Sequence, residues 1–272
     1  MTDFLARRER FASVGSTNDV VRDWLAEGTA EVCLAVADEQ TAGRGRDGRG
    51  WVSPSGAALL LSLGFRPDWL PPDRAWRLVA TTSLAMADAA EEVAGLAEGT
   101  IRLKWPNDLV IEAVDGGVRK LAGLLAETDG LGTDDPRVVV GLGINADWAK
   151  ADYPDGLAAS MTSLREASGG RPADRDALLD AFLGRLDVRI GALRGGRFDG
   201  AGWTTRQLTT GRDLQVSGHD GSLETLRAVG VDASTGGLLV ADPDAPGGER
   251  QLLVGEIVHV RLADPAHLSS GV

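Results

Sequence analysis

The chain has 272 residues, 43% of them hydrophobic and 25% charged, and its formal net charge is −12. This composition is typical of a soluble globular protein with one large domain, or with one large and one small domain. The acidic balance disfavours binding to nucleic acid, the single cysteine excludes an internal disulfide, and no apolar run approaches the roughly 20 residues of a membrane-spanning helix.

The elements expected before residue 200 alternate between strands and helices. Met1 to Arg10 is charged and lacks the apolar core of a signal peptide, so we expect a cytoplasmic protein. The cap-type residues Ser16-Thr17-Asn18 precede a first helix that Gly28 ends. Hydrophobic periodicity predicts further helices at 74–93 and 174–193, and strands at 10–14, 32–37, 57–65, 101–105, 109–112, 121–128 and 138–144. The polar stretch 149–175 is expected to be a surface excursion with one short helix.

After Trp203 the pattern changes to short apolar runs separated by glycine-rich turns. Five short strands at close spacing favour a small barrel. We therefore predict two domains, 1–208 and 209–272.

Three arginines alternate with four glycines in the sequence GRGRDGRGW at residues 43–51, here called the glycine–arginine loop. Glycine leaves the backbone unobstructed, and arginine offers a fork of donors that suits carboxylates and phosphates. The segment also matches the dinucleotide pattern G-x-G-x-x-G, but that pattern requires a helix to begin within it. The following Trp51-Val52-Ser53-Pro54 cannot continue a helix, so the open alternatives are an anion-binding loop and a solvated basic loop.

Two later segments group polar residues beside apolar strands. Lys104-Trp105-Pro106-Asn107-Asp108 places a lysine, an amide and a carboxylate at a strand break, because Pro106 removes a ladder donor. This is either an ordinary turn or a group that orients a phosphate. Lys120 precedes the apolar run 121–125 and is either a solvated strand-end lysine or a functional cation.

Taken together, these segments resemble the biotin protein ligases. The resemblance rests on five motifs in the order and approximate spacing of that family, and it is close over residues 10–148. The motifs are Ser16-Thr17-Asn18, Gln40-Thr41-Ala42-Gly43-Arg44-Gly45-Arg46, Lys104-Trp105-Pro106-Asn107-Asp108, Lys120-Leu121-Ala122-Gly123 and Gly141-Leu142-Gly143-Ile144-Asn145. It implies an α/β (α+β) fold, with a catalytic domain like that of class II aminoacyl-tRNA synthetases and a small C-terminal SH3-like β-barrel.

The resemblance also implies the site. Biotin would lie beside Ser16, Thr17, Asn18, Gln40, Gly43, Arg44, Gly45, Arg46, Lys120 and Gly123. The nucleotide would lie near Arg46, Arg49, Trp51, Lys104, Asn107, Asp108 and Asn145. Lys120, Arg46 and Asp108 are the implied catalytic residues. Asp47 and Gly50 stand where another basic residue is common in the family.

Such enzymes join biotin to ATP and pass the biotinyl group to a lysine of a biotin carboxyl carrier domain. The implied substrates are therefore ATP and biotin, with Mg²⁺ held mainly by the ATP phosphates. The implied partner is the carrier domain of an acetyl-CoA, acyl-CoA or pyruvate carboxylase. Some members carry a helix-turn-helix domain before the ligase motifs, but Ser16 comes too early for one, so we expect no nucleic-acid partner and no membrane partner. A homodimer is compatible with this reading.

Two other functions stay open at this point. A biotin-responsive binding protein would keep the pocket and lose the nucleotide residues, yet Arg49, Asn107, Asp108 and Asn145 are all present. A lipoate or fatty-acyl transferase of the same fold would transfer an acyl group without ATP and would not need the arginine loop.

Overall fold

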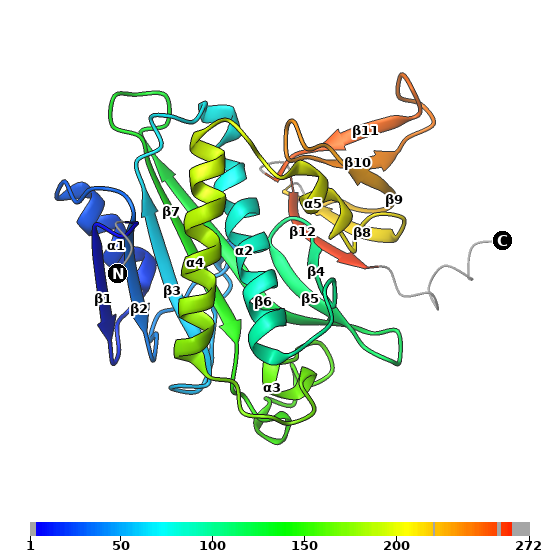
Figure 1. The fold of residues 1–272 in the computed structure, drawn as a ribbon. Helices are drawn as coiled ribbons and strands as arrows, with labels where there is room; N and C mark the ends of the chain where they lie inside the picture. Colours follow the sequence, from blue (N-terminus) through cyan, green and yellow to red (C-terminus); the bar gives the residue numbers. More distant parts are fainter. Residues whose placement is uncertain (1–3, 220, 255–256, 263–272) are drawn as a thin grey trace. The chain divides into compact units, whose positions relative to one another are not determined.

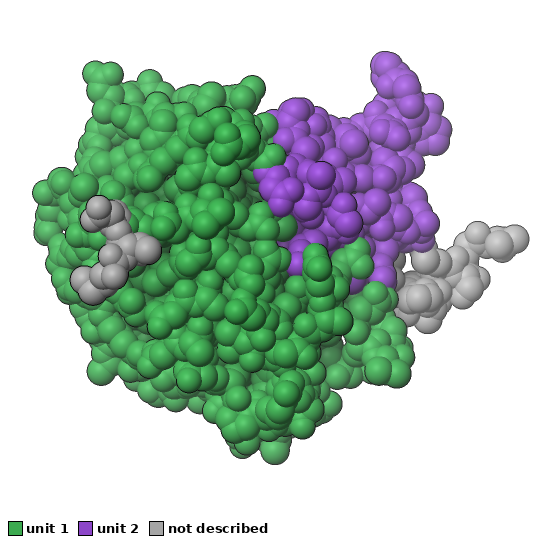
Figure 2. Space-filling view, in the orientation of Figure 1, with its two compact units in different colours: residues 1–102, 107–198 green, residues 103–106, 199–272 purple. Residues whose placement is uncertain are grey.

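The computed structural model describes residues 4–219, 221–254 and 257–262. It divides into two compact units, one of residues 1–102 and 107–198 and one of residues 103–106 and 199–272 (Figure 2). The domains 1–208 and 209–272 expected from the sequence stay a prediction, and residues 263–272 lie outside the described residues.

The first unit is built on a sheet of seven strands in the order β1-β2-β3-β7-β6-β5-β4 (Figure 1). β1 runs parallel to β2, whereas β2–β3, β3–β7, β7–β6 and β6–β5 are antiparallel pairs. The strands are β1 (Arg7–Phe11), β2 (Cys33–Ala37), β3 (Ala58–Phe65), β4 (Ile101–Lys104), β5 (Asp108–Glu112), β6 (Val118–Asp129) and β7 (Arg137–Asn145). The helices of this unit are α1 (Thr17–Ala26), α2 (Trp76–Ala94), α3 (Leu164–Ala167) and α4 (Arg175–Arg194).

The long helices α2 and α4 pack side by side across one face of this sheet (Figure 1). Asp174 caps α4 by accepting hydrogen bonds from the backbone N–H groups of Asp176 and Ala177. The apolar residues whose periodicity predicts this helix are buried, namely Leu178, Leu179, Phe182, Leu186 and Ile190.

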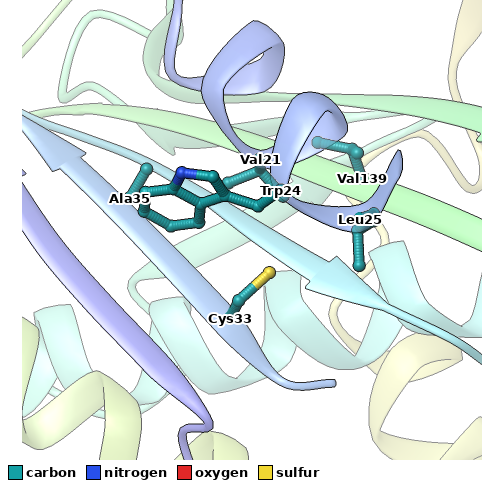
Figure 3. Close-up of a cluster of buried hydrophobic side chains, with 6 residues drawn as sticks. All are labelled: Val21, Trp24, Leu25, Cys33, Ala35 and Val139. Carbon is teal, nitrogen blue, oxygen red and sulfur yellow. The ribbon is translucent and has the colours of Figure 1, made fainter. Parts of the chain in front are cut away.

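The short helix α1 covers one end of the opposite face. Its Val21, Trp24 and Leu25 pack with Cys33, Ala35 and Val139 (Figure 3). Burial raises the pKa of the Cys33 thiol to about 11, as expected for a structural rather than a reactive cysteine. With helices on both sides, every residue of β3 is buried. The Trp51 ring of the glycine–arginine loop lies against Gly143 of β7, two residues along the strand from the Gly141 that contacts Asn18 of α1.

Unit 2 contains α5 (Gly200–Thr205) and a five-stranded sheet in the order β11-β10-β9-β8-β12. Its strands are β8 (Asp213–Gly218), β9 (Leu223–Val231), β10 (Leu238–Ala241), β11 (Glu249–Leu252) and β12 (Ile257–Leu262), and all paired neighbours are antiparallel. The segment 103–106 joins this unit through buried Trp105, whose Nε1 donates to the Gly236 carbonyl at 2.9 Å.

Some elements differ from the sequence predictions. β1 ends at Phe11 rather than Val14, because residue 14 already turns toward the α1 cap and makes only an isolated bridge to Gln40. β6 begins at Val118 and therefore includes Lys120. Helix α5 was not predicted, since its sequence GAGWTT shows no helical apolar stripe. Over the described ranges, no helix is long and apolar enough to cross a membrane.

Gly64 gives a test of the packing beneath α1. A methyl group at this position would lie 2.6 Å from Cys33 Sγ and 2.7 Å from Val21 Cγ1. Gly64→Ala should therefore lower the free energy of unfolding by about 1–3 kcal/mol, the usual cost of overpacking a filled core. Urea denaturation followed by circular dichroism measures the change.

Gly184→Ala is the matched control. Gly184 is exposed on α4, and no atom lies within 4 Å of the added methyl. It should stabilise the protein by about 0.5–1 kcal/mol, because alanine favours helix more than glycine does. Equal effects of the two substitutions would contradict the packing described here.

Candidate active site

The glycine–arginine loop folds back on itself as a short hairpin. Trp51 N–H donates to the Gly43 carbonyl at 2.9 Å, and Gly45 N–H donates to the Arg49 carbonyl at 2.6 Å. The tip is a 3₁₀ turn in which Asp47 has φ 56° and Gly48 has φ 72°. All of residues 43–51 are described and no α-helix begins among them, so this segment lacks the helix of a dinucleotide-binding motif.

The loop lays the Trp51 ring on a patch of sheet that carries no side chains. Gly123 of β6 and Gly143 of β7 are directly opposed in the register, and we call this pair the glycine floor. A Cβ atom at Gly143 would lie 2.6 Å from Trp51 Cε2, and one at Gly123 would lie 3.3 Å from Cζ3. The buried Trp51 Nε1 finds no acceptor among the described residues. Only glycine at both positions lets an indole come this close.

Lys120 stands at the edge of the glycine floor. Its Nζ lies 2.7 Å from Asp108 Oδ1 and 5.6 Å from the Trp51 ring centroid. Its side chain is 39% exposed, so the ammonium can still reach a ligand. Lys120 is therefore an ion-paired residue inside β6 and not a solvated lysine at a strand end.

The backbone of Lys120 is fixed by the excursion that follows β7. Lys120 N–H donates to Ser160 O at 2.8 Å, and Thr162 N–H donates to Lys120 O at 2.9 Å. Asn145 supports the same segment, because its Nδ2 donates to Thr162 O at 2.9 Å. The polar stretch 149–175 thus positions the site, a role that the sequence did not suggest.

A buried polar chain joins the cap of α1 to β3. Gln40 Oε1 accepts from Thr17 N at 2.7 Å and from Thr17 Oγ1 at 2.9 Å. Thr17 Oγ1 lies 2.7 Å from Ser62 Oγ, which donates to Asn18 Oδ1 at 2.6 Å. The sequence motifs therefore meet in space, together with Ser16 at the helix cap.

Ser62 is part of this buried chain of polar side chains, and it was not predicted from the sequence. The signal was a single serine inside the apolar strand ALLLSLGF, where a buried hydroxyl needs a partner. Asn18 Nδ2 is buried and finds no acceptor in the described part of the chain. Gly141 lies against this amide, since a Cβ there would be 2.2 Å from Asn18 Oδ1.

The three arginines of the loop have different surroundings. Arg44 makes two hydrogen bonds to Asp19, each of 2.8 Å, and one of 3.0 Å to Glu127. Arg46 is partly buried, and this burial lowers the pKa of its guanidinium from the ordinary value. Arg49 Nε donates to Arg46 O at 3.1 Å.

The remaining predicted nucleotide residues are placed as follows. Asn107 lies beside β6, where its Nδ2 donates to Leu124 O at 2.6 Å. Lys104 ends β4 within the segment 103–106 that belongs to unit 2. The described residues contain no group of three or more histidine, cysteine, aspartate or glutamate side chains that could hold a metal ion. The ligand roles of all these residues stay predictions.

Comparison with known proteins fits this geometry. Residues 11–145 match the model of the biotin/lipoate A/B protein ligase family. A biotin–acetyl-CoA-carboxylase ligase of Mycobacterium tuberculosis is 32% identical over 92% of this chain and 88% of its own length. The chain belongs to the biotin protein ligase family.

Two further relatives show how far the likeness extends. The structure of the biotin protein ligase of Aquifex aeolicus in complex with biotin and ATP is similar with a TM-score of 0.76, at 25% identity, over 94% of this chain and 99% of that one. The bifunctional ligase/repressor BirA of Bacillus subtilis is 34% identical over a segment that covers 62% of this chain and 49% of that protein.

Gly143→Ala tests the contact between the Trp51 ring and the glycine floor. The added methyl would occupy the space of the indole, so the ring should lift toward solvent and the emission of Trp51 should shift to the red. The contribution of Trp51 is isolated as the difference from the same protein carrying Trp51→Phe.

Gly230→Ala is the control for this experiment. Gly230 also lies in a strand, but the nearest atom to an added methyl is 4.0 Å away. Its Trp51 emission should stay unchanged. An unshifted spectrum in Gly143→Ala would mean that Trp51 does not rest on the floor in solution.

Proposed function

We propose that this protein is a biotin protein ligase that activates biotin with ATP and transfers the biotinyl group to a lysine of a biotin carboxyl carrier domain. The observation that carries the proposal is the grouping of Lys120, Asp108 and the glycine–arginine loop around the glycine floor, next to a buried polar chain. The likeness to a ligase structure that contains biotin and ATP supports it.

The polar chain is suited to a ureido ring, which offers two donors and one acceptor. Hydroxyl and amide groups can match all three, and the buried Asn18 amide has hydrogen-bonding capacity left. Lys120 and Gly123 would border the ring, and the loop would close over it. The biotin-binding set comprises Ser16, Thr17, Asn18, Gln40, Gly43, Arg44, Gly45, Arg46, Lys120 and Gly123.

Adenylation brings two anions together. An oxygen of the biotin carboxylate attacks the α-phosphorus of ATP, a new C–O–P linkage forms, and the bond to the pyrophosphate leaving group breaks. Lys120 and Arg46 would stabilise the negative charge that gathers in the transition state. A water-poor site strengthens this effect, and the partial burial of Arg46 favours it.

The nucleotide would be held by Arg46, Arg49, Trp51, Lys104, Asn107, Asp108 and Asn145. Mg²⁺ would neutralise the pyrophosphate while bound mainly to the ATP phosphates. Among the described residues, no three or more histidine, cysteine, aspartate or glutamate side chains form a cluster that could hold the ion. In the second step the acceptor lysine attacks the acyl carbon and AMP leaves, and Asp108 is the proposed acceptor of the lysine proton.

The acceptor that we propose is the carrier domain of an acetyl-CoA, acyl-CoA or pyruvate carboxylase. We further infer that the first unit has the fold of a class II aminoacyl-tRNA synthetase and that the five-stranded sheet of unit 2 is an SH3-like barrel. The absence of a nucleic-acid partner, the cytoplasmic location and a homodimer stay predictions.

Incubation of the protein with ATP, Mg²⁺, a carrier domain and either biotin or lipoate tests the function. Intact mass should show a biotinyl adduct on the carrier that requires ATP. A lipoyl adduct in place of the biotinyl adduct, or acyl transfer without ATP, would indicate the related transferases. Binding of biotin without any adduct would indicate a binding protein.

Lys120→Ala should lower the rate of biotinyl-adenylate formation by at least about 100-fold, the typical loss when one preorganised donor to a transition-state anion is removed. Pyrophosphate release at saturating biotin and ATP measures this rate. Arg8→Ala is the control, because Arg8 is an exposed cation on β1 that lies 4.0 Å from Asp180 of α4 and is not among the proposed site residues. Near-normal pyrophosphate release by Lys120→Ala would remove Lys120 from the chemistry.

A further inference from the structure

Two carboxylates and two arginines form a compact group at the base of the glycine–arginine loop. Asp19 comes from the first turn of α1, and Glu127 comes from β6. Arg44, in the first half of the loop, bonds both of them, with distances of 2.8, 2.8 and 3.0 Å. Arg22 of α1 lies 2.7 Å from Asp19 and 3.9 Å from Glu127.

The Arg44 guanidinium therefore joins three separate parts of the chain. Its two bonds to Asp19 use both carboxylate oxygens, the forked geometry that makes such pairs stronger and more directional than a single contact. The hydrogen bond from Arg44 is the main cause that lowers the pKa of Asp19, so the pair is fully charged at neutral pH. Arg22 shares the same carboxylates but belongs to α1, so it cannot restrain the loop.

The ion pairs of Arg44 restrain the glycine–arginine loop close to Trp51. With four glycines, residues 43–51 lose much conformational entropy when they close. The backbone of Arg44 bridges Gly50, and one residue further on Trp51 lies over the glycine floor. Arg44 is fixed to α1 and β6 by its ion pairs, and it pairs through its backbone with Gly50. The ion pairs therefore also restrain Gly50 and the Trp51 that follows it.

We propose that Arg44 is a positioning residue whose ion pairs with Asp19 and Glu127 hold the glycine–arginine loop closed and set how long the acyl-adenylate is retained. This inference rests on the proposed function for its ligand, but not for its effect on the loop. The Arg44 side chain makes these ion pairs with the protein, so its place in the biotin-binding set would be filled by its backbone.

The test compares Arg44→Gln with Arg22→Gln, which removes the same charge from the same carboxylates without releasing the loop. Amide hydrogen exchange of the wild-type apo protein and both variants reports loop closure through the N–H groups of Gly45 and Trp51, which are bonded within the hairpin. Arg44→Gln should speed exchange at these two amides by about 3- to 10-fold, the scale expected for loss of a few well-placed surface ion contacts. Arg22→Gln should leave both within about twofold of the wild type.

Retention of the adenylate is measured separately. Preformed biotinyl-adenylate should leave Arg44→Gln about 3- to 10-fold faster than the wild type. Pyrophosphate release at saturating biotin and ATP should change by less than about twofold in the double variant Asp19→Asn with Glu127→Gln, which keeps every proposed ligand-binding residue. Arg44→Lys should restore part of the retention, since it keeps the charge and loses the fork. The double variant Asp19→Asn with Glu127→Gln should reproduce Arg44→Gln, and adding Arg44→Gln to it should give no further acceleration.

Each result decides the proposal. Unchanged exchange at Gly45 and Trp51 in both Arg44→Gln and the double variant, or equal acceleration by Arg22→Gln, would overturn it. Faster exchange with normal adenylate release would overturn the retention role. A wild type that forms no adenylate would refute the proposed function, whereas the exchange comparison would still decide whether Arg44 holds the loop.

Discussion

The pairing of Gly123 with Gly143 is the constraint on which the site depends. In a sheet, side chains at opposed positions on one face normally meet and fill the space above the strands. At this pair nothing stands above the backbone, so the indole of Trp51 reaches the sheet surface. A loop can therefore close directly on the strands that carry Lys120 and Asn145. A side chain at Gly143 would occupy the place of the Trp51 ring, and one at Gly123 would crowd both this ring and Lys120 Nζ.

A second constraint fixes the cation beside that floor. Lys120 is held at both backbone groups by residues 160 and 162, and the segment around them is stabilised by Glu166. Burial alone would raise the pKa of Glu166, but hydrogen bonds from Lys150, Thr162 and Tyr153 outweigh it and hold the pKa below the ordinary value. Glu166 is therefore charged at neutral pH and accepts these bonds. The polar segment 149–175 after β7 thus holds the backbone of Lys120 in place.

Much of the fold could be predicted from the sequence, because the long elements carry strong local patterns. The helix from Arg175 to Arg194 and the apolar strand from Ala58 to Phe65 appear close to their expected positions. The site motifs could be found as well, since their unusual residue types stand together along the chain. Their spatial partners could not. Asp19, Ser62 and Glu127 are ordinary residues in sequence, and only the strand register and the closure of the loop bring them to Thr17 and Arg44.

The hairpin of the glycine–arginine loop also explains why Arg44 and Arg46, which share the repeated Gly-Arg pattern, have different surroundings. Arg44 lies in the stem of the hairpin, where the side chain reaches α1 and β6, and Arg46 lies at the tip, where it is partly buried. At physiological salt the screening length is about 8 Å, so most of the acidic surface is too distant to repel a bound phosphate. The local potential is set by the few charges around the glycine floor. Asp19 and Glu127 form ion pairs with Arg44 in the stem of the hairpin, whereas Lys120 lies at the floor beside the Trp51 ring. A chain with a net charge of −12 could in this way hold the nucleotide that we propose as its ligand.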